Sequence, residues 1–107
     1  MSVPEIDVDA LAELQAAGAT IVDVREPDEY DEAHVPGVQL IPLGEVPERF
    51  EEIPSEGTIY VICRSGARSA RAAEFLIGQG LEAVNVAGGT LAWIDSGRPV
   101  DTGGEAS

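Results

Sequence analysis

Short apolar runs separated by polar turns give this chain the pattern of a sheet with helices between its strands. Residues 20–24 (TIVDV) and 58–63 (TIYVIC) are rich in β-branched side chains and almost continuously apolar, which is typical of parallel strands covered on both faces. Residues 38–41 (VQLI) and 83–86 (AVNV) show a weaker form of the same pattern. We predict a strand in each of these four segments.

The first helical pattern covers residues 7–17. Asp7 is a preferred N-cap residue, and Gly18 follows the last turn of the pattern. Val8 and Leu11 mark its apolar face, which continues through Gln15 or Leu14. A helix over this segment is therefore predicted to precede the strand at residues 20–24.

A second helix is predicted around residues 46–53, where Val46, Phe50 and Ile53 are spaced at i, i+4 and i+7. The opposite face of this pattern is acidic. We interpret its charges as a solvated face rather than a docking site; they belong to Glu48, Glu51 and Glu52.

Two further helices are predicted, from about Arg68 to Gln79 and from about Leu91 to Ser96. The longer one would bury Ala72, Phe75 and Leu76, and Gly80 would end it. The alternation of strands and helices indicates one α/β domain over residues 1–100 with a largely parallel sheet. The tail at residues 101–107 has too little apolar content to order itself, and we expect it to be disordered.

The net charge of the chain limits the kinds of partner that it can bind. Six arginines and no lysines oppose 20 acidic side chains, for a formal net charge of −14. Such a surface disfavours binding to nucleic acid and to anionic membranes. The acidity suggests a salt-rich cytosol that screens the self-repulsion; equal unfolding midpoints in low and molar potassium chloride would contradict this hypothesis.

The N-terminal sequence MSVPEIDVDA lacks the basic and apolar regions of a signal peptide, and no apolar run approaches the roughly 20 residues of a membrane span. We therefore expect a cytoplasmic protein. One cysteine and one histidine cannot form an internal disulfide or a zinc cluster. We expect chemistry without a metal or another cofactor.

The single cysteine, Cys63, ends a predicted strand just before the third helix. The residues between them, RSGA (64–67), must turn sharply at the carboxyl edge of the sheet, where open α/β sheets place their ligands. Gly66 allows the backbone to curl so that successive N–H groups form an anion-binding nest at the helix N-terminus. Arg64 and Arg68 add local positive charge. Together these groups would favour the thiolate of Cys63 and make it nucleophilic.

The alternative is that Cys63 serves only as a small buried hydrophobic residue, which is common for free cysteine. Arginines and a glycine are poor surroundings for an inert thiol, and three of the six arginines lie within eight positions of Cys63. We therefore interpret Cys63 as a reactive thiol.

Three stretches of the chain are similar to a known family. CRSGARS (63–69) resembles the active-site loop of single-domain rhodaneses, which are sulfurtransferases. VDVREPDEYDEAHVPGVQLIPL (22–43) is similar to the family's Asp-Val-Arg segment followed by Glu-Tyr and Gly-His-Ile-Pro-Gly-Ala. In that last motif Ala33, Val35 and Val38 replace glycine, isoleucine and alanine, and Ala33 would restrict the turn. NVAGGTLAWIDSGRPV (85–100) resembles the closing Gly-Gly and Trp segment.

The resemblance covers nearly the whole chain and implies a rhodanese-like fold, with a five-stranded, mainly parallel sheet flanked by helices on both faces. It implies a thiosulfate sulfurtransferase in which Cys63 takes a sulfane sulfur from thiosulfate or a related donor and holds it as a persulfide. The acceptor would be cyanide or a thiol, since no second cysteine is present to resolve the persulfide.

By the same resemblance, Arg64 and Arg68 would bind the sulfonate end of the donor, and backbone N–H groups of the loop would steady the terminal sulfur. The implied substrate-binding residues are Arg64, Ser65, Gly66, Ala67, Arg68 and Ser69.

Three polar residues of the 22–43 segment each have a role that we weigh against an alternative role. Arg25 could extend the anion site or form a structural ion pair with Glu29 at i, i+4. Asp23 is expected to order a neighbouring loop through backbone hydrogen bonds rather than to perform acid-base chemistry. His34 could titrate near neutrality, but the family resemblance places it in a structural segment.

Near the end of the chain, Gly88 and Gly89 are predicted to form the turn that starts the last helix, and Trp93 to be a core or lid aromatic. Ser69 could cap the helix after the loop or donate a hydrogen bond to the thiolate. The sequence leaves both roles of Ser69 open.

Three other functions compete with sulfur transfer by an enzyme. Cysteine phosphatases and arsenate reductases also use an arginine-bearing anion loop, but the phosphatase spacing is Cys-x5-Arg, whereas Cys63 and Arg68 are spaced Cys-x4-Arg, a tighter nest. Ile62 also stands where tyrosine phosphatases carry histidine. A noncatalytic rhodanese-like binding module is the second alternative, and the intact loop argues against it. The third is a persulfide carrier, whose acidic surface would steer toward a basic protein partner.

Overall fold

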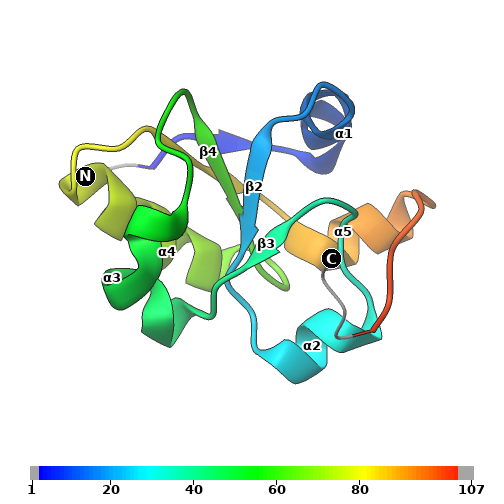
Figure 1. The fold of residues 1–107 in the computed structure, drawn as a ribbon. Coiled ribbons are helices and arrows are strands. Elements are labelled where there is room, and N and C mark those ends of the chain that lie inside the picture. Colours follow the sequence, from blue (N-terminus) through cyan, green and yellow to red (C-terminus); the bar gives the residue numbers. More distant parts are fainter. Residues whose placement is uncertain (1–2, 104–107) are drawn as a thin grey trace.

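A five-stranded parallel sheet forms the centre of the protein (Figure 1). The computed structural model describes residues 3–103. The strands follow the spatial order β1-β5-β4-β2-β3, and every neighbouring pair is parallel. This confirms the predicted α/β class and the five-stranded sheet. The strands are β1 (Glu5–Ile6), β2 (Thr20–Asp23), β3 (Gln39–Leu40), β4 (Ile59–Ile62) and β5 (Ala83–Val86).

The order of the strands brings three strand ends together. β4 lies between β2 and β5, with Asp23 opposite Ile62 and Val61 opposite Asn85. Because all three strands run in the same direction, the residues that follow them meet at one edge of the sheet. Cys63 therefore emerges between the ends of β2 and β5.

The edge strand β1 was not predicted from the sequence. It contains only Glu5 and Ile6, which pair with Asn85 and Val86 of β5. Glu5 is exposed and Ile6 is only half-buried, so the segment has no apolar run that would distinguish it from a loop.

Helices cover both faces of the sheet. On one face Leu76 of α4 (Ala67–Gly78) packs in a core with Ile59 and Val61, and α3 (Val46–Arg49) contributes Val46 to it. On the other face Ile62 shares a core with residues of α1 (Val8–Ala16), α2 (Pro27–Glu32) and α5 (Gly89–Asp95). Successive side chains of β4 point to opposite faces of the sheet. The strand is apolar at consecutive positions because each face is covered by its own core.

The helix predicted at residues 46–53 is shorter than expected. α3 ends at Arg49 and is flanked by the 3₁₀ turns Leu43–Glu45 and Phe50–Glu52. Ile53 is extended, with φ −85° and ψ 129°, because Pro54 follows it and disfavours helical geometry at the preceding residue. Ile53 is still buried, so the predicted apolar face is confirmed although the helix is not continuous.

The other predicted helices are confirmed, with differences at their ends. Asp7 caps α1 by accepting a hydrogen bond from the Ala10 amide at 2.9 Å. α4 begins at Ala67 and α5 at Gly89, so each starts earlier than predicted. α2 was not predicted, because Pro27 and its acidic neighbours do not form an apolar stripe. Glu26 and Glu29 start it with a reciprocal capping box.

The end of the described chain returns to α2. The amides of His34 and Asp101 each donate to the other residue's carbonyl at 2.9 Å, and the Gly103 amide donates to the Asp31 carbonyl at 2.7 Å. The chain is therefore hydrogen-bonded as far as Gly103. The remainder of the tail that was predicted to be disordered, residues 104–107, lies outside the described residues.

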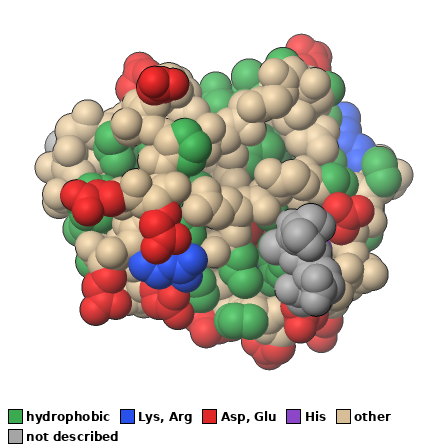
Figure 2. All heavy atoms as spheres, in the orientation of Figure 1, with side chains coloured by type: hydrophobic (Ala, Val, Ile, Leu, Met, Phe, Trp, Pro, Cys, Tyr) green, Lys and Arg blue, Asp and Glu red, His purple; other side chains and the backbone are tan. Residues whose placement is uncertain are grey.

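Acidic side chains are spread over the face shown in Figure 2, where basic side chains appear in few places. Some of the arginines are paired on the surface, Arg49 with Glu45 and Glu52 and Arg98 with Asp9. Within residues 3–103 no helix has the length and apolarity needed to cross a membrane.

Candidate active site

Cys63 lies at the base of a tight turn between β4 and α4. The turn is possible because Gly66 adopts φ +116°, a left-handed conformation that side chains other than glycine disfavour. Cys63 is only 1% exposed, whereas Arg64 and Ser65 are exposed. The thiol is therefore buried under the loop, whereas the polar side chains of the loop face solvent.

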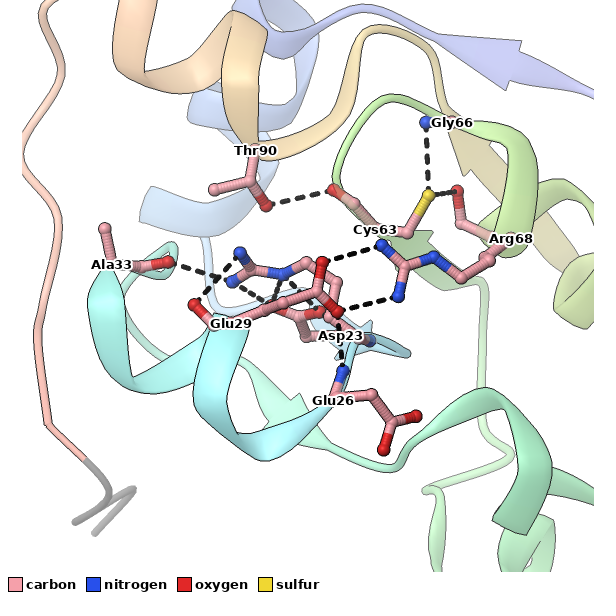
Figure 3. Close-up of polar contacts among 10 residues, drawn as sticks. Asp23, Glu26, Glu29, Ala33, Cys63, Gly66, Arg68 and Thr90 are labelled. Atoms are coloured by element: carbon pink, nitrogen blue, oxygen red, sulfur yellow. Dashed lines mark hydrogen bonds and ion pairs between the residues drawn. The ribbon is translucent and has the colours of Figure 1, made fainter.

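The start of α5 fixes the loop from the other side. The Thr90 hydroxyl donates to the Cys63 carbonyl at 3.0 Å (Figure 3). The Thr90 amide donates to the same carbonyl at 2.8 Å, and the Leu91 amide donates to the Arg64 carbonyl at 3.1 Å. A Cβ at Gly89 would lie 2.5 Å from both carbonyl oxygens. Gly89 therefore permits the close approach, and the prediction that Gly88 and Gly89 start this helix is confirmed.

Hydrogen-bond donors converge on the sulfur of Cys63. The Gly66 amide lies 3.1 Å from Sγ and the Ser69 hydroxyl 3.3 Å from it. Burial raises the pKa of the Cys63 thiol, but the Ser69 hydroxyl and the backbone amides of Ser69, Gly66 and Ser65 outweigh burial and lower this pKa below its ordinary value. The loop therefore favours a thiolate through neutral donors.

Ser69 does not cap α4. The N-cap position is Gly66, and Ser69 lies in the first turn with its side chain directed at Cys63 and at Asn85 of β5. Of the two roles left open for Ser69, the structure supports the contact with the sulfur.

Arg68 forms an ion pair instead of standing free beside the thiol. Its two terminal nitrogens contact the two Glu29 carboxylate oxygens at 2.7 and 2.8 Å (Figure 3). The hydrogen bonds from Arg68 lower the pKa of Glu29 to about 2, and the same contact raises the pKa of Arg68. An anion binding to Arg68 would share it with Glu29.

Arg64 has a different environment. Among residues 3–103 no carboxylate lies within ion-pair distance of it. It borders a cavity of about 360 Å³ between α2, the loop and the start of α5. Two arginines, Arg25 and Arg64, and two carboxyl residues, Glu29 and Glu32, contribute to the wall of this cavity, together with Ala33, Thr90, Leu91 and Ile94. Arg64 is thus available to an anionic ligand.

The buried partner of Arg25 is Asp23 rather than Glu29. The Arg25 Nη2 lies 2.8 Å from the Asp23 carboxylate, which also accepts from the Arg25 backbone amide at 3.0 Å. The other guanidinium N–H groups donate to the carbonyls of Glu29 and Ala33. Of the two interpretations of Arg25, the structure supports a structural ion pair, but its partner is Asp23 and not Glu29. The prediction that Asp23 orders the neighbouring loop is confirmed.

His34 and Trp93 lie in the core. The His34 ring stacks on Tyr30 with centroids 3.6 Å apart, and its Nδ1 lies 2.8 Å from the Tyr30 carbonyl. The Trp93 indole N–H donates to the Pro99 carbonyl at 2.9 Å. Both residues are buried, so of the two roles considered for Trp93 the structure supports the core.

Residues that sequence reasoning did not assign to the site complete it. Thr90 anchors Cys63, Glu29 holds Arg68, and Asn85 contacts Ser69 and the Gly66 carbonyl. One feature of the sequence indicated a role for Asn85: it is a polar residue within the otherwise apolar strand predicted at residues 83–86. Within the described part of the chain, no group of three or more His, Cys, Asp or Glu side chains could hold a metal ion.

These features define a parallel α/β domain with a buried thiol at the carboxyl edge of its sheet, and hydrogen-bond donors converge on the sulfur. Comparison with known proteins places it in a family. Residues 7–96 match the family model described as "Rhodanese-like domain". The chain therefore belongs to the rhodanese-like domain family.

The relatives include proteins named for sulfur chemistry. A sulfurtransferase of Allochromatium vinosum is 37% identical over 101 residues, which cover 92% of this chain and 94% of that protein. The Bacillus subtilis protein named "Putative sulfur carrier protein YrkF" is 44% identical over 95 residues, or 86% of this chain, but this chain spans only 51% of its length. A rhodanese-related protein from Thermoplasma volcanium has a solved structure with a TM-score of 0.86 and 38% identity, covering 92% of this chain and 97% of that one.

Proposed function

We propose that this protein is a sulfurtransferase that carries a sulfane sulfur as a persulfide on Cys63. The observation that supports this most directly is the convergence of the Gly66 amide and the Ser69 hydroxyl on Sγ. Donors held in this way stabilise negative charge on sulfur without rearrangement during the reaction.

The proposed reaction has two balanced halves. The Cys63 thiolate attacks the outer sulfur of thiosulfate, the S–S bond of thiosulfate breaks, and sulfite leaves with the bonding electron pair. The enzyme then carries a persulfide anion. Attack on its terminal sulfur by cyanide forms thiocyanate and regenerates the Cys63 thiolate; a thiolate acceptor would instead leave as a persulfide.

The loop residues have separate roles in this proposal. Arg64 binds the sulfonate end of the donor, because no carboxylate among residues 3–103 pairs with it and it borders the cavity. Arg68 contributes to the same binding while remaining bonded to Glu29. The backbone between Ser65 and Ala67 supplies N–H groups that would face the terminal persulfide sulfur.

A persulfide carrier is the second candidate, and the likeness to a protein named as a sulfur carrier favours it. Such a carrier would accept sulfur readily from one protein donor and turn over thiosulfate poorly. The net charge of −14 would favour a basic partner. Fast transfer from low-millimolar thiosulfate to cyanide would argue against this version.

Intact mass measurement tests the proposal. The reduced protein is incubated with thiosulfate beside Cys63→Ser, and cyanide is then added. We expect a gain of one sulfur atom in the wild type alone, and its loss with release of thiocyanate. If thiosulfate adds no sulfur but a persulfidated protein donor does, the protein is a carrier. If neither adds sulfur, the domain binds without catalysis and the proposal is wrong.

A further inference from the structure

The Ser69 hydroxyl stands between two hydrogen-bond acceptors. Its Oγ lies 2.5 Å from Asn85 Oδ1 and 3.3 Å from Cys63 Sγ. Ser69 and Asn85 are 0% and 1% exposed, so both contacts are shielded from bulk solvent. A hydroxyl carries one hydrogen, and it therefore donates to only one of these acceptors at a time.

The orientation of the Asn85 amide is determined by its other contacts. Asn85 Nδ2 lies 2.9 Å from Glu5 Oε2 and 3.1 Å from the Gly66 carbonyl oxygen. Both partners only accept hydrogen bonds. A flipped amide would place its oxygen against two other oxygens, so Oδ1 must face Ser69 as an acceptor.

Two arrangements of the hydroxyl hydrogen follow. With Cys63 as a thiol, Ser69 donates to Asn85 Oδ1 and the Cys63 S–H donates to Ser69 Oγ, which satisfies all three groups. With Cys63 as a thiolate, the hydroxyl rotates to donate to Sγ and leaves buried Asn85 Oδ1 without its donor. An unsatisfied buried acceptor costs free energy, so ionisation of Cys63 carries a cost that originates in Asn85.

We propose that Asn85 is a positioning residue that competes with the Cys63 sulfur for the single proton of Ser69 and thereby restrains ionisation of the nucleophile. A thiolate becomes less nucleophilic as it becomes less basic, and the optimum for sulfur exchange lies near ambient pH. Loop amides already favour the anion, and Asn85 keeps the sulfur basic enough to attack. This consequence for catalysis rests on the proposed sulfurtransferase function.

Charged groups from several elements also surround Cys63. They are Glu5 of β1, the buried pair Asp23 and Arg25 at the end of β2, Glu29 of α2 with its partner Arg68 of α4, and Arg64 of the loop. The variants chosen to test Asn85 change none of these charges, but Asn85→Ala removes the hydrogen bond to Glu5, and this loss is shared by the Asn85→Ala single and double variants.

The test compares Asn85→Ala, Ser69→Ala and the double variant. The apparent pKa of Cys63 is read from the pH dependence of its alkylation by iodoacetamide, with intact mass confirming one modification. Ser69→Ala removes a donor to the thiolate, so the apparent pKa should rise. Asn85→Ala frees the hydroxyl for the thiolate, so the apparent pKa should fall by about 0.5 to 1 unit.

The double variant distinguishes two possible roles of Asn85: competing with Cys63 for the Ser69 proton, or holding the loop through the Gly66 carbonyl. If Asn85 acts through Ser69, the double variant has the same apparent pKa as Ser69→Ala. If Asn85 only anchors the Gly66 carbonyl, its removal shifts the pKa equally in both backgrounds, and the proposal is wrong. An unchanged or raised pKa in Asn85→Ala would also overturn it.

A second measurement does not require Asn85→Ala to fold. The single cysteine gives one S–H stretching band, which moves to lower frequency when the thiol donates a hydrogen bond. We expect a hydrogen-bonded band in the wild type and a shift to higher frequency in Ser69→Ala. Identical bands would contradict the proposed thiol arrangement. Neither readout depends on sulfur transfer, so failure to load sulfur from both thiosulfate and a persulfidated protein donor would refute the function and not this inference.

Discussion

The loop around Cys63 and the segment around Asp23 begin at the ends of neighbouring strands, β4 and β2. Their buried polar groups differ in whether they are neutralised by one another. Asp23 and Arg25 neutralise each other, and carbonyls of Glu29 and Ala33 take up remaining guanidinium N–H groups. Around Cys63, donors converge on one sulfur atom that bears full negative charge only after ionisation. The comparison teaches that a closed polar network holds structure, whereas an open one stabilises charge that develops during a reaction.

The closed network should be the more sensitive of the two to the loss of one partner. Asp23→Ala leaves Arg25 buried without its counter-ion, and we expect the free energy of unfolding to fall by about 3 to 5 kcal/mol in urea denaturation. Glu45→Ala, which breaks the exposed pair with Arg49, is the control and should change stability little. A loss below about 1 kcal/mol in Asp23→Ala would show that the network is not structural.

The contact between α5 and the Cys63 loop provides the next test. Gly89→Ala would push a Cβ against two loop carbonyls at a positive φ, and should cost about 2 to 4 kcal/mol of unfolding free energy. Gly57→Ala has a similar positive φ but open space around its Cβ, so it should cost only about 1 to 2 kcal/mol. Equal losses in the two variants would mean that the close approach at Gly89 does not matter.

The two loop arginines should differ in donor binding. Arg64→Ala should raise the thiosulfate concentration for half-maximal persulfide formation by about 10- to 100-fold, equivalent to about 1.5 to 3 kcal/mol for a charge-assisted hydrogen bond. Arg68→Ala should have a smaller effect, because Glu29 already shares that guanidinium. Arg71→Ala, an exposed change of the same charge on α4, is the control. A larger effect from Arg68 than from Arg64 would reverse the assignment.

The Glu29–Arg68 pair should make a pH-dependent contribution to stability. The pKa of Glu29 is about 2 in the fold against an ordinary 4.5, so its stabilisation is present above about pH 4.5 and lost as the pH falls toward 2. After allowance for solvent screening, Glu29→Gln should lower the free energy of unfolding by about 1 to 2 kcal/mol at pH 6. The difference from wild type should narrow between pH 4.5 and 2.5, and a constant difference would exclude this ion pair as its source.

The apolar pattern was sufficient to predict most of the fold. Residues 20–24 and 58–63 became β2 and β4 because each is buried on both faces. The short strand β1 was missed because its order comes from pairing with β5, which has no local signature. The helix at 46–53 was too long in the prediction because Pro54 was not weighed against the apolar spacing.

The sequence predicted which loop residues surround the thiol, but it did not predict which carboxylates pair with the arginines of the site. The thiol, the glycine turn and the loop donors all lie within seven consecutive positions, Cys63 to Ser69, so local reasoning could find them. One ion-pair partner was considered from sequence spacing, Glu29 for Arg25, as an alternative to a role of Arg25 in the anion site. The fold instead brings Glu29 to Arg68, 39 positions away in the chain.

The sequence by itself determined that this chain forms a parallel α/β sheet and places one thiol at the start of a glycine turn, because periodicity and turn chemistry are local properties of a chain. Only the tertiary structure decided that Glu29 pairs with Arg68 and that Arg64, the other loop arginine, has no carboxylate partner among residues 3–103. It also decided that Thr90 fixes the loop, and that Asn85 and the Cys63 sulfur both lie within hydrogen-bond distance of the Ser69 hydroxyl. These contacts join residues distant in sequence, and their geometry exists only after the strands have paired and the helices have packed on the sheet.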